Sequence, residues 1–273
     1  MRMREGKAGG KGSALNTINT GVDPMQTHLR HIAQSAALYL MAALFLLAGT
    51  ALPLQGQTNE ADQTKPLLFF PERVPEKAYW QSAGLTAVAP PVEITEEMQV
   101  RWPAFDYHAL YGIPYGFSLE GRAAVQVLQN RFSVGPRWTS SAGPVAFSLG
   151  WDVAYWFGIL TVSGFDSKAH GWEGSPNVSL GYRFGDIAAT FKVEALMDYS
   201  FSSSQGDLEV TSHSTWFSGM GYSFVLEQPF YGQHYLTLGF RAMYTKFYWE
   251  TWPLFPTFDR YLFFPEIIVG WIL

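Results

Sequence analysis

The segment IAATFKVEALMDYSF, residues 187–201, decides the fold class because apolar and polar residues alternate along it. Every odd position is apolar or aromatic, and the even positions include Thr190, Lys192, Glu194, Asp198 and Ser200. Successive side chains of a β-strand point to opposite faces of the sheet. This segment is therefore predicted to be a strand with one apolar face and one charged face.

The same alternation recurs between Gly116 and Leu273 in about eight segments, several of which run to twelve residues or more. Strands of a soluble sandwich are usually about five or six residues long and must cover their apolar face with a second sheet. Long strands with one apolar face are typical of a barrel that faces lipid. We therefore predict an all-β, antiparallel up-and-down transmembrane β-barrel of about eight strands over residues 116–273.

The composition agrees with a membrane barrel. Charged residues make up 15% of the chain, against about 25% in soluble domains. The mean hydropathy is close to zero, which excludes a bundle of membrane helices. A net charge of -5 gives no reason to expect a nucleic-acid partner, and the absence of cysteine excludes disulfides, thiolate chemistry and a lipid-modified cysteine.

The N-terminal region is predicted to direct export. The apolar run Ala36–Ala48 follows Arg30 and precedes small residues, as in a secretory signal peptide. It is shorter than the roughly 20 residues that a membrane anchor needs. We assign residues 25–57 to a Sec signal, cleaved after Ala51 or a few residues later. Starting at Met25 gives a signal of ordinary length, so residues 1–24 are predicted not to be translated.

Residues 58–115 are predicted to form an irregular segment before the barrel. Six prolines between residues 66 and 103 interrupt any long element. We interpret the segment as a periplasmic lead-in or a plug-like segment, with an extra strand near Met98–Trp102 as the alternative.

The connections between strands alternate in length from the third strand onward. Three are long and polar or rich in Gly and Pro: Asp166–Pro176, Ser202–His213 and Trp249–Arg260. The joins between them are shorter. Outer-membrane barrels have short periplasmic turns and longer external loops. The long connections are therefore predicted to be external, with both ends of the barrel in the periplasm.

Aromatic residues gather near both predicted strand ends. Trp and Tyr concentrate at membrane interfaces because part of the ring is apolar and part can form hydrogen bonds. The predicted girdle comprises Trp138, Tyr155, Trp156, Tyr199, Tyr235, Tyr248, Trp249 and Trp271. In the last external loop, Trp252, Phe255 and Phe258 are predicted to be exposed contact residues.

If the apolar face points to lipid, the charged face lines the lumen. The predicted lumen network comprises Glu120, Arg122, Asp152, Arg183, Lys192, Glu194, Asp198, Arg241 and Glu266. Two interpretations remain open. Paired charges can fill a narrow lumen, since an unpaired buried charge is strongly unfavourable. Alternatively, Arg183, Lys192 and Arg241 face Glu194, Asp198 and Asp152 across a gated pore.

In this architecture the chain resembles the small eight-stranded outer-membrane barrels, and most of all the outer-membrane protein W family. The resemblance covers Gly116 to Leu273 and depends on architecture, because no diagnostic motif is present. Such barrels commonly end in Phe or Trp, whereas here Trp271 is followed by Ile272 and Leu273. The resemblance implies a narrow, porin-like route for small hydrophobic molecules with a lateral exit.

These features predict a protein of the outer membrane of a diderm bacterium, with outer-membrane lipid and the assembly machinery as partners. The expected function is a narrow channel or carrier for small solutes, hydrophobic ones included. The alternative is a closed structural or adhesin-like barrel that binds a host or surface ligand through its loops. Ser212-His213-Ser214 is too weak a pattern for catalysis, and the six His form no metal-binding array. We therefore expect no enzyme activity, cofactor or metal.

Overall fold

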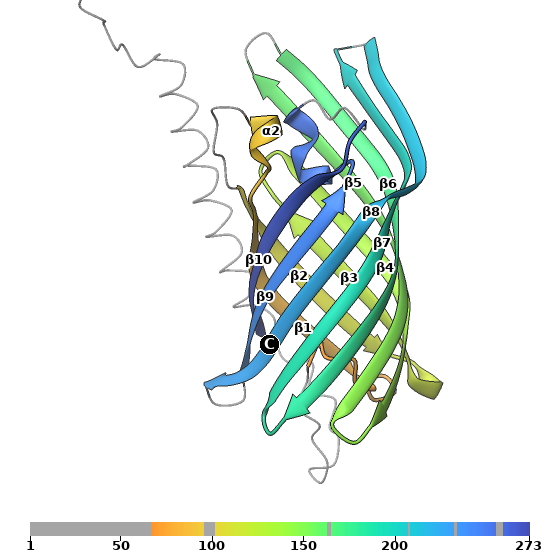
Figure 1. Cartoon of the computed structure of the whole chain (residues 1–273), viewed down its shortest axis with the longest axis vertical. Coiled ribbons are helices and arrows are strands. Elements are labelled where there is room, and N and C mark those ends of the chain that lie inside the picture. The colour runs from red at the N-terminus through yellow and green to blue at the C-terminus, as the bar shows by residue number, and fades with distance from the viewer. Residues whose placement is uncertain (1–66, 96–101, 163–164, 207, 232–233, 255–258) are drawn as a thin grey trace, which may run out of the picture. The chain divides into compact units, whose positions relative to one another are not determined.

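The computed structural model describes residues 67–95, 102–162, 165–206, 208–231, 234–254 and 259–273. The predictions for residues 1–57, Phe255 and Phe258 lie outside these ranges. The described residues form a closed, antiparallel, up-and-down barrel, which confirms the predicted fold class (Figure 1). Its elements are β1 (Tyr79–Val88), α2 (Val92–Thr95), β2 (Trp102–Gly112), η1 (Pro114–Gly116), β3 (Phe117–Val125), β4 (Gln129–Ala142), β5 (Val145–Val162), β6 (Phe165–Phe184), β7 (Ile187–Gln205), β8 (Leu208–Tyr231), β9 (His234–Thr245), η2 (Trp249–Leu254) and β10 (Leu262–Ile272).

Ten strands close the barrel within the described residues, so the prediction of about eight is wrong. The two additional strands, β1 and β2, come from the segment that was predicted to be irregular before residue 116. β1 pairs with β10, from Ser82↔Ile272 to Val88↔Glu266, and this ladder closes the barrel. Of the extra strand proposed near Met98–Trp102, only Trp102 is among the described residues, and it is the first residue of β2 (Trp102–Gly112). β1 was missed because Ala, Gly and Ser give its alternation little contrast in hydropathy.

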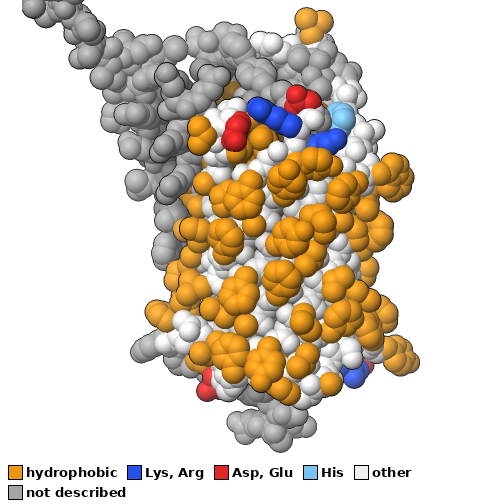
Figure 2. Space-filling view, viewed as in Figure 1, with side chains coloured by type: hydrophobic (Ala, Val, Ile, Leu, Met, Phe, Trp, Pro, Cys, Tyr) orange, Lys and Arg blue, Asp and Glu red, His pale blue; other side chains and the backbone are white. Residues whose placement is uncertain are grey.

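The wall of the barrel has an apolar outer face. Figure 2 shows hydrophobic side chains covering the visible wall, with charged side chains gathered near its two ends. A closed belt of this kind is typical of barrels whose surroundings are lipid. Members of the belt from separate strands, each between 43% and 59% exposed, include Leu119, Phe132, Phe191, Phe224, Phe240 and Ile267.

Four consecutive strands, β5 to β8, are much longer than the others. They contain 18 to 24 residues, whereas the other six contain 9 to 14. Two of the predicted long loops are therefore wrong, because Asp166–Pro176 lies within β6 and Ser202–His213 forms parts of β7 and β8. Their polar residues continue the strand pairing as two hairpins that extend the wall at one end.

Two segments fold into the lumen from opposite ends of the barrel. At the end where β1 begins and β10 ends, the N-terminal insert (residues 67–78) packs among Ala146, Ala188, Tyr235 and Ile272. At the other end, the mouth insert (residues 247–253, containing most of η2) packs against apolar residues of several strands. The third predicted long loop, Trp249–Arg260, is thus partly buried inside the barrel. No helix among the described residues is both long and apolar enough to cross a membrane.

Candidate functional site in the barrel lumen

A polar chamber lies in the lumen, with a volume of about 50 Å³. This volume has room for a few water molecules. Its wall combines charged side chains with small polar ones, which leave more space than large side chains at inward positions would. The small polar residues that line it are Ser133, Ser175, Asn177, Ser179, Thr190 and Ser223.

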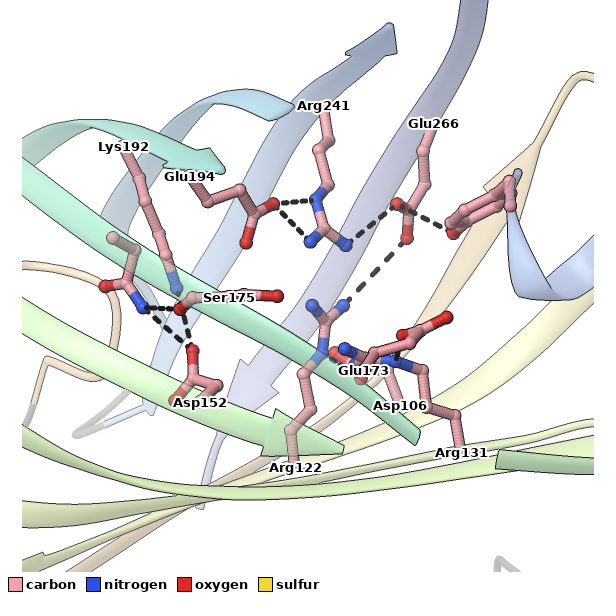
Figure 3. Close-up of polar contacts among 12 residues, drawn as sticks. Asp106, Arg122, Arg131, Asp152, Glu173, Ser175, Lys192, Glu194, Arg241 and Glu266 are labelled. Carbon is pink, nitrogen blue, oxygen red and sulfur yellow. Dashed lines mark hydrogen bonds and ion pairs between the residues drawn. The ribbon is translucent and has the colours of Figure 1, made fainter. Parts of the chain in front are cut away.

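Arg241 of β9 contacts two carboxylates of the chamber wall (Figure 3). Its Nε donates to Glu194 Oε1 at 2.8 Å, and its Nη1 lies 3.4 Å from Glu266 Oε2. All three residues are buried, with at most 9% exposure. One guanidinium therefore compensates the charge of two buried carboxylates, so removing it would leave both without their main partner.

Arg122 extends this arrangement toward β2. Its Nε donates to Asp106 Oδ1 at 2.6 Å, and its Nη2 lies 3.9 Å from Glu266 Oε1 (Figure 3). The hydrogen-bond chain also reaches the mouth insert, because the Tyr248 hydroxyl donates to Glu266 Oε2 at 3.4 Å. The charges of five strands, β2, β3, β7, β9 and β10, are thus joined to one of the closing segments.

A second set of charges lies on neighbouring strands. Lys192 Nζ is 3.6 Å from Asp152 Oδ2, which also accepts a hydrogen bond of 2.9 Å from the Asn177 amide. Arg131 Nε donates to Glu173 Oε2 at 2.9 Å. These short, opposite-charge contacts make the chamber wall polar without leaving its cations unpaired.

Arg137 connects the chamber to the N-terminal insert. Its Nη1 lies 3.5 Å from Glu120 Oε2 and donates to the Leu68 carbonyl at 2.9 Å. His108 Nε2 lies 2.9 Å from the other oxygen of Glu120. The Phe69 ring meets the His108 ring edge-on at 5.0 Å. The insert therefore contacts the lumen charges directly.

Glu227 holds the N-terminal insert from the opposite wall. Its two carboxylate oxygens accept hydrogen bonds from three consecutive backbone amides, those of Leu68, Phe69 and Phe70, at 2.7 to 3.1 Å. A carboxylate that accepts several backbone N–H groups forms strong, charge-assisted hydrogen bonds. The insert also packs closely against Gly181, since a Cβ there would lie 2.6 Å from Phe70 Cε2 and from Pro71 Cδ.

Glu72 of the insert forms a further contact with the wall. Arg183 Nη2 donates to Glu72 Oε2 at 2.5 Å, and its guanidinium lies over the Phe70 ring at 5.0 Å. Burial and, to a lesser extent, nearby Glu227 together raise the pKa of Glu72 to about 7, against the opposing effect of Arg183. The charge of this insert residue therefore changes near neutral pH.

The mouth insert is seated by Glu250 and Trp252. Gln126 Nε2 donates to Glu250 Oε2 at 2.9 Å, and Gln129 Nε2 donates to the Glu250 carbonyl at 2.9 Å. Burial, with nearby Glu266 as a second cause, raises the pKa of Glu250 to about 8. The Trp252 ring lies where a side chain at Gly158 would be, since a Cβ there would be 2.1 Å from Trp252 Nε1.

Replacing Gly158 with alanine is expected to displace Trp252, because the new Cβ would overlap the indole ring. Hydroxyl-radical footprinting read by mass spectrometry measures the exposure of this tryptophan, which is 5% in the native chain. We expect its labelling rate to rise severalfold. The Gly121→Ala variant is the control, because the nearest atom to its Cβ would be the Ser133 carbonyl oxygen at 4.0 Å. Equal labelling of Trp252 in both variants would show that this ring does not pack against Gly158.

The structure brings most of the predicted lumen residues together. Arg241 contacts Glu194, and Lys192 contacts Asp152, which both interpretations of the lumen charges allow. Arg183 differs, because its partner is Glu72 of the insert. Asp198 is buried next to Glu173, the residue opposite it in the β6–β7 ladder.

Sequence reasoning missed several polar residues that hold the chamber and its inserts. Alternation from Phe105 to Tyr111 could have revealed the β2 positions. By contrast, no local sequence pattern indicates that a residue near a strand end contacts an insert from a distant part of the chain. The missed residues are Glu72, Asp106, His108, Glu173, Glu227 and Glu250.

The aromatic predictions need correction at five positions. Trp156, Tyr235, Tyr248, Trp249 and Trp252 are each 5% exposed or less and lie inside the barrel. Trp156 follows Tyr155 in β5, and adjacent strand residues point to opposite faces. Tyr248, Trp249 and Trp252 belong to the mouth insert. Of the predicted girdle, Trp138, Tyr155, Tyr199 and Trp271 retain exposed surface.

The contacts in the lumen are polar and ionic. Among the described residues, no group of three or more His, Cys, Asp or Glu is arranged to hold a metal ion. The arrangement can bind water or a small polar group between fixed charges. Passage of a larger solute would require the inserts to move.

No protein-family model matches the chain, and no curated protein matches it. Solved structures similar to it include Neisserial surface protein A (NspA), at 11% identity and a TM-score of 0.37, covering 71% of this chain and 96% of that one. The translocator domain of autotransporter NalP from Neisseria meningitidis has 6% identity and a TM-score of 0.33, covering 71% and 87%. The P. putida toluene transporter TodX has 8% identity and a TM-score of 0.30, covering 71% and 67%.

Proposed function

We propose that this protein is an integral β-barrel of the outer membrane of a diderm bacterium, exported through the Sec pathway. We also propose that it is a gated, narrow channel or carrier for small solutes, hydrophobic ones included. The apolar belt supports the membrane location, with outer-membrane lipid and the assembly machinery as partners. Bacterial barrels have short periplasmic turns, so the end where β1 begins and β10 ends would face the periplasm and the long hairpins the exterior.

The observation that carries the proposal is the polar chamber in the lumen, which lies between the N-terminal insert and the mouth insert. Both inserts are held in the lumen by non-covalent contacts, and many of these involve buried carboxyls, Glu227 of the wall and Glu72 and Glu250 of the inserts. In this proposal the described state is the closed one, and opening requires the release of one insert or both.

The conductance is expected to depend on pH. Burial raises the pKa of Glu72 from its ordinary value of 4.5 to about 7, and that of Glu250 from 4.5 to about 8. Such carboxyls favour the seated inserts most below pH 4.5, and this contribution declines as pH rises to 7 and 8, respectively. Planar-bilayer recordings should therefore show few openings near pH 5 and frequent openings near pH 9.

The control for this experiment is the Glu72→Gln/Glu250→Gln double variant, which has neither titrating group. We expect its opening frequency to change little over the same pH range. If wild type and the double variant respond equally to pH, these two carboxyls do not control the closures. If no condition or variant produces openings, the channel proposal fails.

The extended hairpins favour a second candidate function. In this alternative the lumen stays closed, and the barrel is a structural or adhesin-like protein that binds a host or surface ligand outside the cell. The observation behind it is that β5 to β8 continue well beyond the neighbouring strands. Cell attachment that is lost on truncation of these hairpins, with no conductance in any variant, would favour it. In neither function do we propose catalysis, a cofactor or a metal.

A further inference from the structure

The outer part of β8 extends far beyond its neighbour β9. β8 contains 24 residues and β9 contains 12. Their ladder ends at Gly219↔Thr245, followed by one hydrogen bond from Lys246 N to the Ser218 carbonyl at 3.0 Å. Farther out, β8 pairs with β7 through contacts such as Asp198↔Thr215 and Gln205↔Leu208. In Figure 1 this hairpin, coloured cyan, stands at the upper right, beyond the end of β9.

This leaves a free strand edge along β8, on the side away from β7. Within the described part of the chain, no strand pairs with that side of Leu208–Ser212 or Ser214–Phe217. The opposite edge of the same four-stranded extension is short. There, β4 pairs with β5 up to Gly158, and Ile159 N donates to the Leu128 carbonyl, so β5 continues only to Val162.

The sequence of this edge offers little protection against pairing, because Glu209 is its one acidic residue. Natural edge strands are usually blunted by lysine, by proline or by very short length. The segment LEVTSHSTWF, residues 208–217, contains no lysine, arginine or proline, and it includes residues that favour strands. Near the barrel wall, Trp216 and Phe217 are 78% and 47% exposed. The edge therefore offers backbone hydrogen-bond groups together with aromatic surface.

We propose that this edge binds an extended segment of another protein by β-strand addition outside the cell. The placement outside the cell rests on the proposed membrane orientation, whereas the pairing itself does not depend on a channel. The segment would add a fifth strand to the extension of β5 to β8. Main-chain hydrogen bonds would supply affinity, and side chains opposite Trp216 and Phe217 would supply preference for aromatic and β-branched residues.

A second copy of this chain in the same membrane fits the edge poorly. Strands of membrane barrels are tilted by about 35–45°, and copies in one membrane are related by rotation about its normal. Two equivalent β8 strands can then differ in direction by at most about twice that tilt, which is roughly 70–90°. Antiparallel pairing needs opposite directions. A flexible segment of a different protein has no such restriction.

The test uses the full chain, ¹⁵N-labelled and folded in detergent micelles. The probe is a synthetic peptide of about ten residues with alternating threonine and tyrosine and a lysine at each end. We expect saturable binding and roughly tenfold slower hydrogen exchange at β8 amides that face away from β7. The same peptide with every amide N-methylated cannot donate backbone hydrogen bonds and should not bind. Equal binding of both peptides, or protection confined to other strands, would overturn the proposal.

Two matched truncations locate the site. In the first, residues 200–213 are replaced by Asn-Gly, which suits a two-residue hairpin turn and removes most of the edge. In the second, residues 161–166 of the β5–β6 hairpin are replaced in the same way. Heat-modifiable migration in gels confirms that each barrel is folded. We expect the first truncation to abolish peptide binding and the second to retain it.

Retained binding after the first truncation would overturn the inference. So would a dimer that forms through the edge and excludes the peptide, because the occupant would then be a second copy. Bilayer recordings of the first truncation separate this test from the channel proposal. Loss of peptide binding with unchanged pH-dependent openings would support both proposals. Loss of peptide binding with no openings in any variant would contradict the channel proposal and would still support β-strand addition.

Discussion

Replacing Gly181 with leucine is expected to convert a nearly silent barrel into one with sustained conductance. A Cβ at this position would lie 2.6 Å from Phe70 Cε2 and from Pro71 Cδ. Such a separation is far below van der Waals contact, and a leucine side chain adds three further carbons. Because Gly181 belongs to a strand of the closed barrel, we expect the N-terminal insert to move and the wall to remain. Planar-bilayer recordings near pH 6 measure the effect.

The Glu227→Ala variant should open the barrel by a different route. It removes the carboxylate that accepts hydrogen bonds from Leu68, Phe69 and Phe70 and introduces no steric clash. Gly121→Leu is the matched control for Gly181→Leu, because the nearest atom to its Cβ would be 4.0 Å away. Hydrogen exchange of the insert amides should accelerate in both test variants and not in the control. Accelerated exchange without conductance would show that the insert is not the gate.

Replacing Arg241 with alanine is expected to lower the free energy of unfolding by about 3 kcal/mol. Removing one partner of a buried ion pair typically costs about 3–5 kcal/mol, and the lower value suits a chamber with room for water. The loss is large because Glu194 and Glu266, which are 3% and 2% exposed, both depend on this guanidinium. Urea unfolding in detergent micelles measures the change.

Two further variants identify the cause of this loss. Lys168→Ala removes an exposed ion pair with Asp166 at 3.8 Å and should change stability by less than about 0.5 kcal/mol. The Arg241→Met/Glu194→Gln double variant should recover much of the stability, because it removes a buried charge with its partner. If Arg241→Ala unfolds at the urea concentration of wild type, its buried ion pairs do not contribute to stability.

Strand phase was the most predictable part of the fold. In β10, Phe263, Ile267 and Trp271 are exposed while Glu266 and Ile272 are buried, as the alternation implies. The same phase would have placed Trp156 inside the barrel, although its residue type suggested a membrane interface. Where phase and residue type disagree, phase prevails, because a side chain cannot reach the other face of its strand.

The candidate site was less predictable because its contacts join residues that are distant in the sequence. Leu68 and Glu227 are 159 positions apart, and Gln126 and Glu250 are 124 apart. No local pattern marks Glu227 as an acceptor for three backbone amides. The prolines before residue 116 hid β1 and β2, although they lie mainly outside the two strands or at their margins.

The alternation between residues 187 and 201 by itself determined that the chain forms long strands with one apolar and one charged face, because that property follows from backbone geometry. It also determined which charged residues of this strand face the lumen, as far as Asp198. Near Asp198 the pairing with β8 becomes irregular, and Phe201 is buried although the alternation would place it on the outer face. Tertiary structure alone decided that ten strands close the barrel, that two inserts occupy its lumen and that β8 extends past β9. Strand number, insertion and unequal pairing depend on which distant segments meet, and alternation within one strand carries no information about its partners.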